Sequence, residues 1–116
     1  MLEISNHEEL IRALKANEVV LIGYYDPDSR EGMMFHYIYR ELQKHADPRI
    51  LVLRVNTRKN PEFVKELPTV PCIRVYYKGR LVFEQQGFFG KLDLDVYVLR
   101  RSIRSVFHGL NISFRI

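Results

Sequence analysis

The 116-residue sequence predicts one domain of the α/β class, in which helices cover both faces of a mixed β-sheet. Two patterns carry this prediction. The run Val19–Tyr25 is continuously apolar and of strand length, which indicates a strand buried on both faces. Two further strand patterns meet at Lys78-Gly79, and so short a connection predicts an antiparallel hairpin in the second half of the chain.

Strand and helix patterns alternate in the order β-α-β-α-β-α-β-β-α, which includes a βαβ unit with parallel strands and a right-handed crossover. In chain order, the expected elements are a strand at 2–4, a helix after Ser5, a strand at Val19–Tyr25, a helix at 33–46, a strand at 50–55, a short helix from Pro61, strands at Cys72–Tyr77 and 80–85, and a helix that Gly109 closes.

Two of the helix starts have a clear capping signal. Ser5, with Glu8 three residues later, predicts a capping box. Asn60 is expected to cap the short helix, with Pro61 at the first position, where its missing N–H costs nothing.

The composition is that of a globular protein, with 47% hydrophobic and 28% charged residues. No apolar run approaches the roughly 20 residues that span a bilayer, and the N-terminal residues do not resemble a signal peptide. We therefore expect a cytoplasmic protein without a membrane partner. Because Cys72 is the only cysteine, it can form no disulfide within the chain and no multi-cysteine metal site.

The net charge of +4 arises in the second half of the chain, where residues 61–116 hold nine basic and five acidic side chains. Arg100, Arg101 and Arg104 form a basic patch on the last helix. Such a patch can bind nucleic acid or an acidic partner. We favour a solvated helix face, so nucleic acid is not the expected partner.

The element order, together with local motifs, resembles the thioredoxin family over residues 1–110, which implies a three-layer α/β/α sandwich. In that family a helix following a central strand begins with CxxC. Here the residues at that place are SREG, residues 29–32. Thr69-Val70-Pro71 stands where the family has a cis-proline facing the CxxC motif, and Gly87 matches a family glycine.

The departures from the family pattern decide the predicted function. Dithiol chemistry needs two cysteines, the first with a lowered pKa, and Ser29 and Gly32 occupy their places. A serine hydroxyl is a weak nucleophile without a base, and His36 lies two turns along the helix. Gly23 stands where the family commonly has a buried acid. Dithiol-disulfide oxidoreductase activity is therefore not expected.

The loop before this helix has a structural interpretation and two functional ones. With Asp28 as N-cap, Glu31 falls at the third helical position, so the two would form a capping box after the turn at Asp26-Pro27. The three carboxylates could instead bind a cation, or the loop could form one wall of a peptide groove. Three carboxylates are few for Ca²⁺ or Mg²⁺, so no metal is expected.

Cys72 directly follows Pro71 and has two interpretations. An activated thiol there could form a mixed disulfide, be glutathionylated or act as a redox sensor. A lone cysteine in an apolar strand is more often a small buried hydrophobe, and we favour that interpretation. The alternation of the strand does not decide which face Cys72 occupies.

Residues 111–116 extend beyond the family pattern. Ile112, Phe114 and Ile116 alternate with polar residues, which indicates an extra strand with one apolar face. This strand could pair with a second copy in a homodimer, or the tail could fold back on its own domain.

The expected function is therefore a redox-inactive, thioredoxin-like protein that binds a protein or peptide, with no cofactor, and the alternative is a single-cysteine redox protein acting through Cys72. The expected binding groove lies between the 26–32 loop and the proline, with the residues Tyr25, Asp28, Ser29, Arg30, Glu31, Val70 and Pro71.

Overall fold

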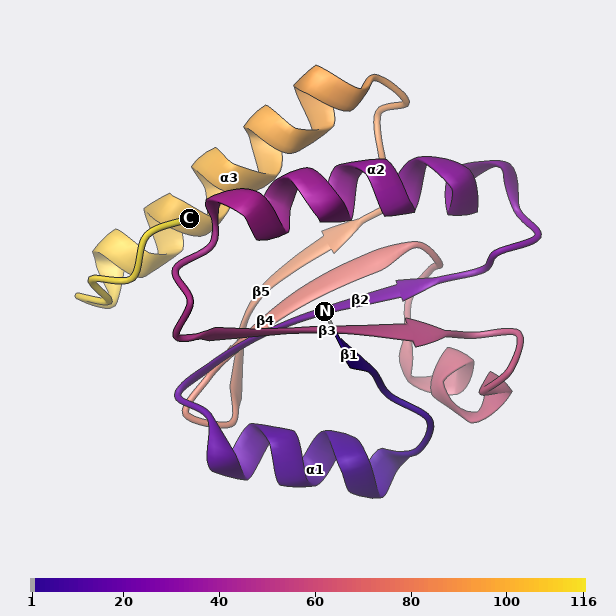
Figure 1. Cartoon of the computed structure of the whole chain (residues 1–116), viewed down its shortest axis with the longest axis horizontal. Helices are drawn as coiled ribbons and strands as arrows, with labels where there is room; N and C mark the ends of the chain where they lie inside the picture. Colours follow the sequence, from indigo (N-terminus) through magenta and orange to yellow (C-terminus); the bar gives the residue numbers. More distant parts are fainter. Residues whose placement is uncertain (1) are drawn as a thin grey trace.

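The computed structural model describes residues 2–116 as a five-stranded mixed sheet between two helical layers (Figure 1). The α/β fold class, the element order and the C-terminal antiparallel hairpin are confirmed. In chain order, the elements are β1 (Leu2–Glu3), α1 (His7–Ala16), β2 (Val19–Tyr25), α2 (Arg30–His45), β3 (Ile50–Asn56), the 3-10 helix η1 (Pro61–Glu66), β4 (Cys72–Tyr77), β5 (Arg80–Gln86) and α3 (Leu92–Gly109).

The strand order across the sheet is β1-β3-β2-β4-β5. Strands β1, β3 and β2 are parallel, whereas β4 runs antiparallel to both β2 and β5. Figure 1 shows α2 and α3 over one face of the sheet and α1 over the other. All seven residues of the central strand β2 are buried, as its continuous apolar run predicts.

The core between the sheet and α2 depends on one glycine. A Cβ at Gly23 would lie 2.6 Å from the ring of Phe35, so only glycine lets this ring approach β2. Tyr39, one turn further along α2, is also fully buried, and its hydroxyl reaches the carbonyl oxygens of Leu21 and Leu53. These contacts fix α2 against the two central parallel strands.

One predicted helix start is shifted by a residue, and another is correct but lacks its side-chain cap. Asn6, not Ser5, caps α1, because the helix begins one residue later and the Asn6 side chain accepts the N–H of Glu9 at 2.9 Å. The third helix is a 3-10 helix that begins at Pro61 with Asn60 at the N-cap position, as predicted, but the Asn60 side chain makes no capping hydrogen bond. The Asn60 side chain instead donates to the carbonyl oxygen of Asn56 at 3.0 Å.

The last helix ends in a Schellman motif, and its left-handed residue is Asn111 (φ 57°) rather than Gly109. The N–H of Ile112 donates to the carbonyl oxygen of Phe107 at 2.8 Å, and the N–H of Asn111 donates to that of His108 at 3.2 Å. The chain therefore reverses direction directly after α3.

Residues 111–116 fold back on their own domain and form no strand. The carbonyl oxygen of Arg115 accepts the N–H of Asp47 at 2.6 Å, the Arg49 guanidinium lies 4.1 Å from the centre of the Phe114 ring, and Ile116 is buried. The alternating apolar side chains thus pack on the core beneath α2 and α3 instead of building a sheet edge. None of the helices in residues 2–116 is long and apolar enough to cross a bilayer.

Candidate functional site

The loop after β2 is closed by Ser29, which is the N-cap of α2. The Ser29 hydroxyl accepts the N–H of Gly32 at 3.0 Å and donates to the carbonyl oxygen of Asp26 at 2.9 Å. The predicted cap at Asp28 is wrong by one residue, because Ser29 is the N-cap and α2 starts at Arg30. The helix also begins three residues before the predicted 33. Glu31 then falls at the second helical position, one place too early for a capping box.

Gly32 lies where the loop touches the first turn of α2. A Cβ at this position would lie 2.0 Å from the carbonyl oxygen of Asp26 and 3.2 Å from the Cα of Pro27. The backbone of the loop thus occupies the space that a side chain at position 32 would need. Any thiol at this place would require the loop to move.

Arg58 joins the loop carboxylates to the segment after β3. Its Nε lies 3.0 Å from Asp26 Oδ1 and 3.3 Å from Asp28 Oδ2. The N–H of Asp28 and the Arg58 guanidinium both donate to Asp26 and hold its pKa below the usual range. The guanidinium thus pairs with both carboxylates. Within residues 2–116, no cluster of three His, Cys, Asp or Glu side chains could hold a metal ion. These contacts support the structural interpretation of the loop.

Tyr25, one of the residues expected to line the groove, is buried in the core. Its side chain is buried on the α2 side of the sheet, stacked on Phe35 with 4.7 Å between ring centroids. Its hydroxyl donates to Glu3 Oε1 at 3.0 Å, and burial followed by this bond raises the pKa of Tyr25. Tyr25 therefore holds β1 and α2 together.

The segment before β4 presents free backbone groups. The Val70–Pro71 peptide bond is cis, and the carbonyl oxygen of Pro71 accepts the N–H of Gly87 at 2.9 Å. Within residues 2–116, neither the N–H nor the C=O of Val70 has a hydrogen-bond partner. The Pro71 ring is buried, whereas Val70 is partly exposed.

A second loop, residues 88–91, is held in place by Asp95. The buried Asp95 carboxylate accepts the N–H groups of Phe89, Gly90 and Lys91, at 2.7, 3.0 and 3.1 Å. The Phe89 side chain is nevertheless 61% exposed. The aromatic ring of Phe89 is thus exposed to solvent, while the buried Asp95 carboxylate holds the backbone of its loop in place.

Between this loop and the first turn of α2 lies a hollow of about 320 Å³. It is lined by Arg30, Glu31, Met34, Phe88, Phe89 and Gly90. The hydrogen bond from Gly87 to Pro71 connects its wall to the Val70 segment.

Only Arg30 and Glu31 of these lining residues were expected from the sequence. The sequence analysis missed Met34, Phe88 and Phe89, although two adjacent aromatic residues between Gly87 and Gly90 were a usable signal.

Cys72 lies on the α1 face of the sheet, with Tyr24 as its neighbour on β2, so its side chain points away from α2. It is 1% exposed. Burial, followed by the negative charge of Glu84, raises the pKa of the Cys72 thiol to about 11. At neutral pH the thiol is protonated and shielded from solvent, which supports the interpretation of Cys72 as a core residue.

The basic patch on α3 is separate from the hollow. Arg101 and Arg104 are exposed, and Arg101 donates to the Tyr97 hydroxyl at 2.8 Å. Arg100 is partly buried, and its Nε has no partner in the described part of the chain.

Several solved thioredoxins share this fold. The chain matches the thioredoxin of Plasmodium falciparum with a TM-score of 0.73 at 17% identity, over 90% of this chain and 98% of that one. It matches oxidised mitochondrial thioredoxin 3 of Saccharomyces cerevisiae with a TM-score of 0.72 at 17% identity, over 90% and 94% of the two chains. The thioredoxin of Malassezia sympodialis gives a TM-score of 0.72 at 14% identity, over 90% and 89%.

The chain therefore has the thioredoxin fold, with a single buried cysteine and no CxxC motif. No family model matches the sequence. No curated protein matches it either. At such low identity the likeness concerns the fold, and the function has to be argued from the residues present.

Proposed function

We propose that this chain is a thioredoxin-fold binding module that holds an extended segment of a protein or peptide between the 26–32 loop and Val70. The observation that carries the proposal is that neither the N–H nor the C=O of Val70 has a hydrogen-bond partner within residues 2–116. An extended segment can hydrogen-bond to both groups, as in β-strand addition. Backbone groups that lack a partner in the chain are available for such a bond.

The hollow between α2 and residues 88–91 supplies side-chain contacts for the bound segment. Phe89 provides an exposed aromatic surface on a fixed backbone, and Met34 provides a flexible apolar side chain that adapts to different shapes. An apolar side chain of the bound segment fits between them. The backbone of Val70 thus provides affinity, and the hollow provides selectivity.

The same geometry argues against covalent chemistry. Both hydrogen bonds of the Ser29 hydroxyl go to backbone groups, so no base activates it. Gly32 leaves no room for a second thiol. The single-cysteine redox alternative is disfavoured by the burial and raised pKa of Cys72.

The test is a selection of displayed random peptides on the folded wild-type protein, followed by measurement of their affinity for variants. Val70→Pro removes the N–H that the proposal uses, and Val70→Thr keeps it. We expect the selected peptides to lose about tenfold or more in affinity on Val70→Pro and on Phe89→Ala, and to keep it on Val70→Thr.

Arg101→Ala, on α3, is the distant control and should leave the affinity unchanged. Circular dichroism checks that each variant is folded. If the selection enriches no peptide, or if enriched peptides bind Val70→Pro and Phe89→Ala as tightly as the wild type, the groove is not the binding site.

A further inference from the structure

Residues 2–116 contain three sulfur atoms, on Met33, Met34 and Cys72. The Cys72 thiol lies in the core on the α1 face of the sheet and is 1% exposed. Met33 and Met34 are neighbours in the N-terminal part of α2, and both side chains reach the surface. An oxidant dissolved in water therefore meets the two thioethers, whereas burial protects the thiol.

The two methionines have different surroundings. Met33 is 68% exposed and does not belong to the lining of the hollow between α2 and residues 88–91. Met34 does belong to this lining, is partly buried, and packs against the core together with Phe88. Met33 thus faces solvent, while Met34 forms part of the wall that would contact a bound segment.

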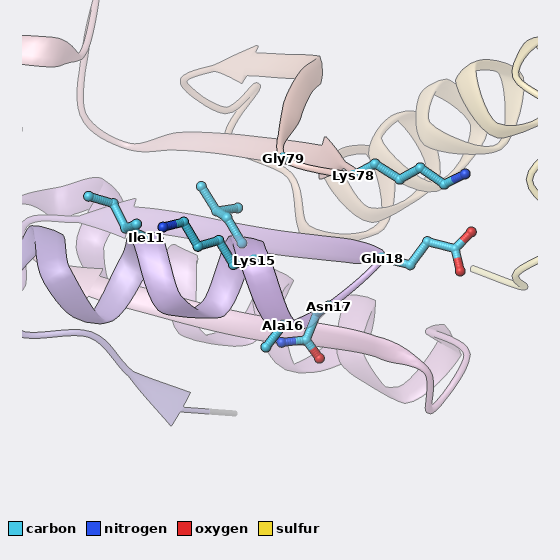
Figure 2. Close-up of a pocket in the computed structure, with 8 residues that line it drawn as sticks. Ile11, Lys15, Ala16, Asn17, Glu18, Lys78 and Gly79 are labelled. Atoms are coloured by element: carbon cyan, nitrogen blue, oxygen red, sulfur yellow. The ribbon is translucent and has the colours of Figure 1, made fainter.

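The larger hollow of the molecule has no such group. It lies between the C-terminal half of α1 and the β4–β5 turn (Figure 2), with a volume of about 670 Å³. None of its lining residues, which include Ile11, Lys15 and Glu18, contains sulfur. Of these two hollows, only the one that Met34 lines can be altered by oxidation of a sulfur atom.

Oxidation changes the chemical character of the Met34 side chain. In the reaction with hydrogen peroxide, a lone pair of Met34 Sδ attacks one peroxide oxygen, the O–O bond breaks, and water leaves after proton transfer. The sulfur is oxidised to a sulfoxide and the peroxide is reduced to water. The product is a polar group at the end of a side chain that was apolar and flexible.

We propose that Met34 is an oxidation-sensitive switch, because its sulfoxide weakens the binding of a protein segment in this hollow. The inference rests on the proposed function, since it concerns the same site. When an apolar side chain binds between Met34 and Phe89, the sulfoxide oxygen is either buried without a donor or turned toward Arg30 and away from the apolar contact. Both arrangements remove the contact of the thioether with the bound side chain. Redox control of this chain then needs no reactive cysteine.

The probe is the peptide of highest affinity from the selection on the wild-type protein, and its binding is followed by fluorescence anisotropy. Met33→Leu leaves Met34 as the methionine of α2, and Met34→Leu leaves Met33. Each variant is treated with hydrogen peroxide until mass spectrometry finds an added oxygen on the fragment that contains residues 33 and 34, and catalase then removes the peroxide. The affinity is compared with that of the same variant before treatment.

We expect oxidised Met33→Leu to bind the probe about fivefold or more weakly than before treatment, because a polar group lies against the bound side chain. Treated Met34→Leu should change less than about twofold, because its sulfoxide at Met33 faces solvent. Methionine sulfoxide reductases should restore the affinity of oxidised Met33→Leu. Met34→Gln places a polar side chain in the wall without any oxidant and should weaken binding, whereas Met33→Gln should not.

Four results would overturn this inference and leave the proposed function in place. They are an unchanged affinity after oxidation of Met34, equal losses for the two treated variants, no oxidation of Met34 in the folded protein, and unfolding of oxidised Met33→Leu as followed by circular dichroism. The last result would assign Met34 to the core. A selection that enriches no peptide would instead overturn the proposed function, and this inference with it.

Discussion

The hollow between α2 and residues 88–91 has two walls, which are held by different means. The 26–32 wall is fixed by the partly buried Ser29 cap, by the Arg58 ion pairs at the surface and by the close packing of the buried Gly32 against Asp26. The 88–91 wall is fixed from the interior by the buried carboxylate of Asp95. Removing a polar contact lowers the free energy of unfolding more when the contact is buried than when water can replace the lost partner. The comparison therefore ranks the residues of the site by their expected effect on stability.

The largest effect is expected for Gly32→Ala. Alanine normally stabilises a helix relative to glycine, but here its Cβ would meet the Asp26 carbonyl oxygen, so the free energy of unfolding should fall by about 3 kcal/mol. Urea denaturation measures this change. Gly109→Ala is the matched control, since nothing lies within 4 Å of its Cβ position, and it should be neutral or slightly stabilising. Similar values for the two variants would contradict the close approach at Gly32.

Asp95→Ala should come next, with a loss of about 2 to 3 kcal/mol, because three N–H groups lose their acceptor. Hydrogen exchange should rise at residues 89–91. Asp93→Ala, in the same helical turn but exposed, should cost only about 0.5 kcal/mol through its interaction with the helix dipole. If Asp95→Ala and Asp93→Ala lower the free energy of unfolding by the same amount, the buried Asp95 carboxylate does not hold the 88–91 wall.

Ser29→Ala removes the cap of α2 and should cost about 1 kcal/mol. Ser5→Ala is an informative control because the sequence pattern predicts a cap at Ser5, whereas the structure places the cap at Asn6. Thermal unfolding should therefore change for Ser29→Ala and stay constant for Ser5→Ala. The opposite ranking would restore the sequence-based assignment of Ser5.

The smallest effect is expected for Arg58→Ala, since its ion pairs are at the surface. The folded-state pKa of Asp26 lies below its unfolded value, so its contribution to stability is present above the unfolded pKa and is lost as the pH falls through the folded one. The wild type should thus exceed Arg58→Ala in stability at neutral pH, and the gap should close in acid. A stability difference between the wild type and Arg58→Ala that stays constant down to low pH would show that Arg58 acts by packing alone. Arg12→Ala is the control for loss of an exposed arginine.

The parts of the fold that depend on continuous apolar patterns could be predicted from the sequence. The bounds of β2 and β4 agree with the structure residue for residue. A strand buried by its neighbours leaves an unbroken apolar run, as in β2, whereas β4 contains Arg74 and is bounded instead by Pro71 and the Lys78-Gly79 turn. The replacement of CxxC was also evident, since it depends on residue identity alone. These features are local, so no knowledge of the tertiary contacts is needed.

The details of the site depend on contacts between distant segments and could not be predicted in this way. Asp26, Asp28 and Ser29 are all good caps, and the approach of Gly32 to the loop selects Ser29. Asp95 looks like an ordinary acidic residue in the first turn of a helix, and its role appears only when the 88–91 loop folds over it. Similarly, the alternation in residues 111–116 suits a strand and a packed tail equally well.

Gly23 and Gly32 together determine how readily this chain could acquire dithiol chemistry. A cysteine at position 32 would displace the Asp26 carbonyl oxygen, and an acid at position 23 would displace the Phe35 ring. Each substitution alone would weaken folding without yielding a working redox site. A route to a reductase would therefore have to rebuild the loop and repack α2 before catalysis brought any advantage, so single steps along that route would be selected against.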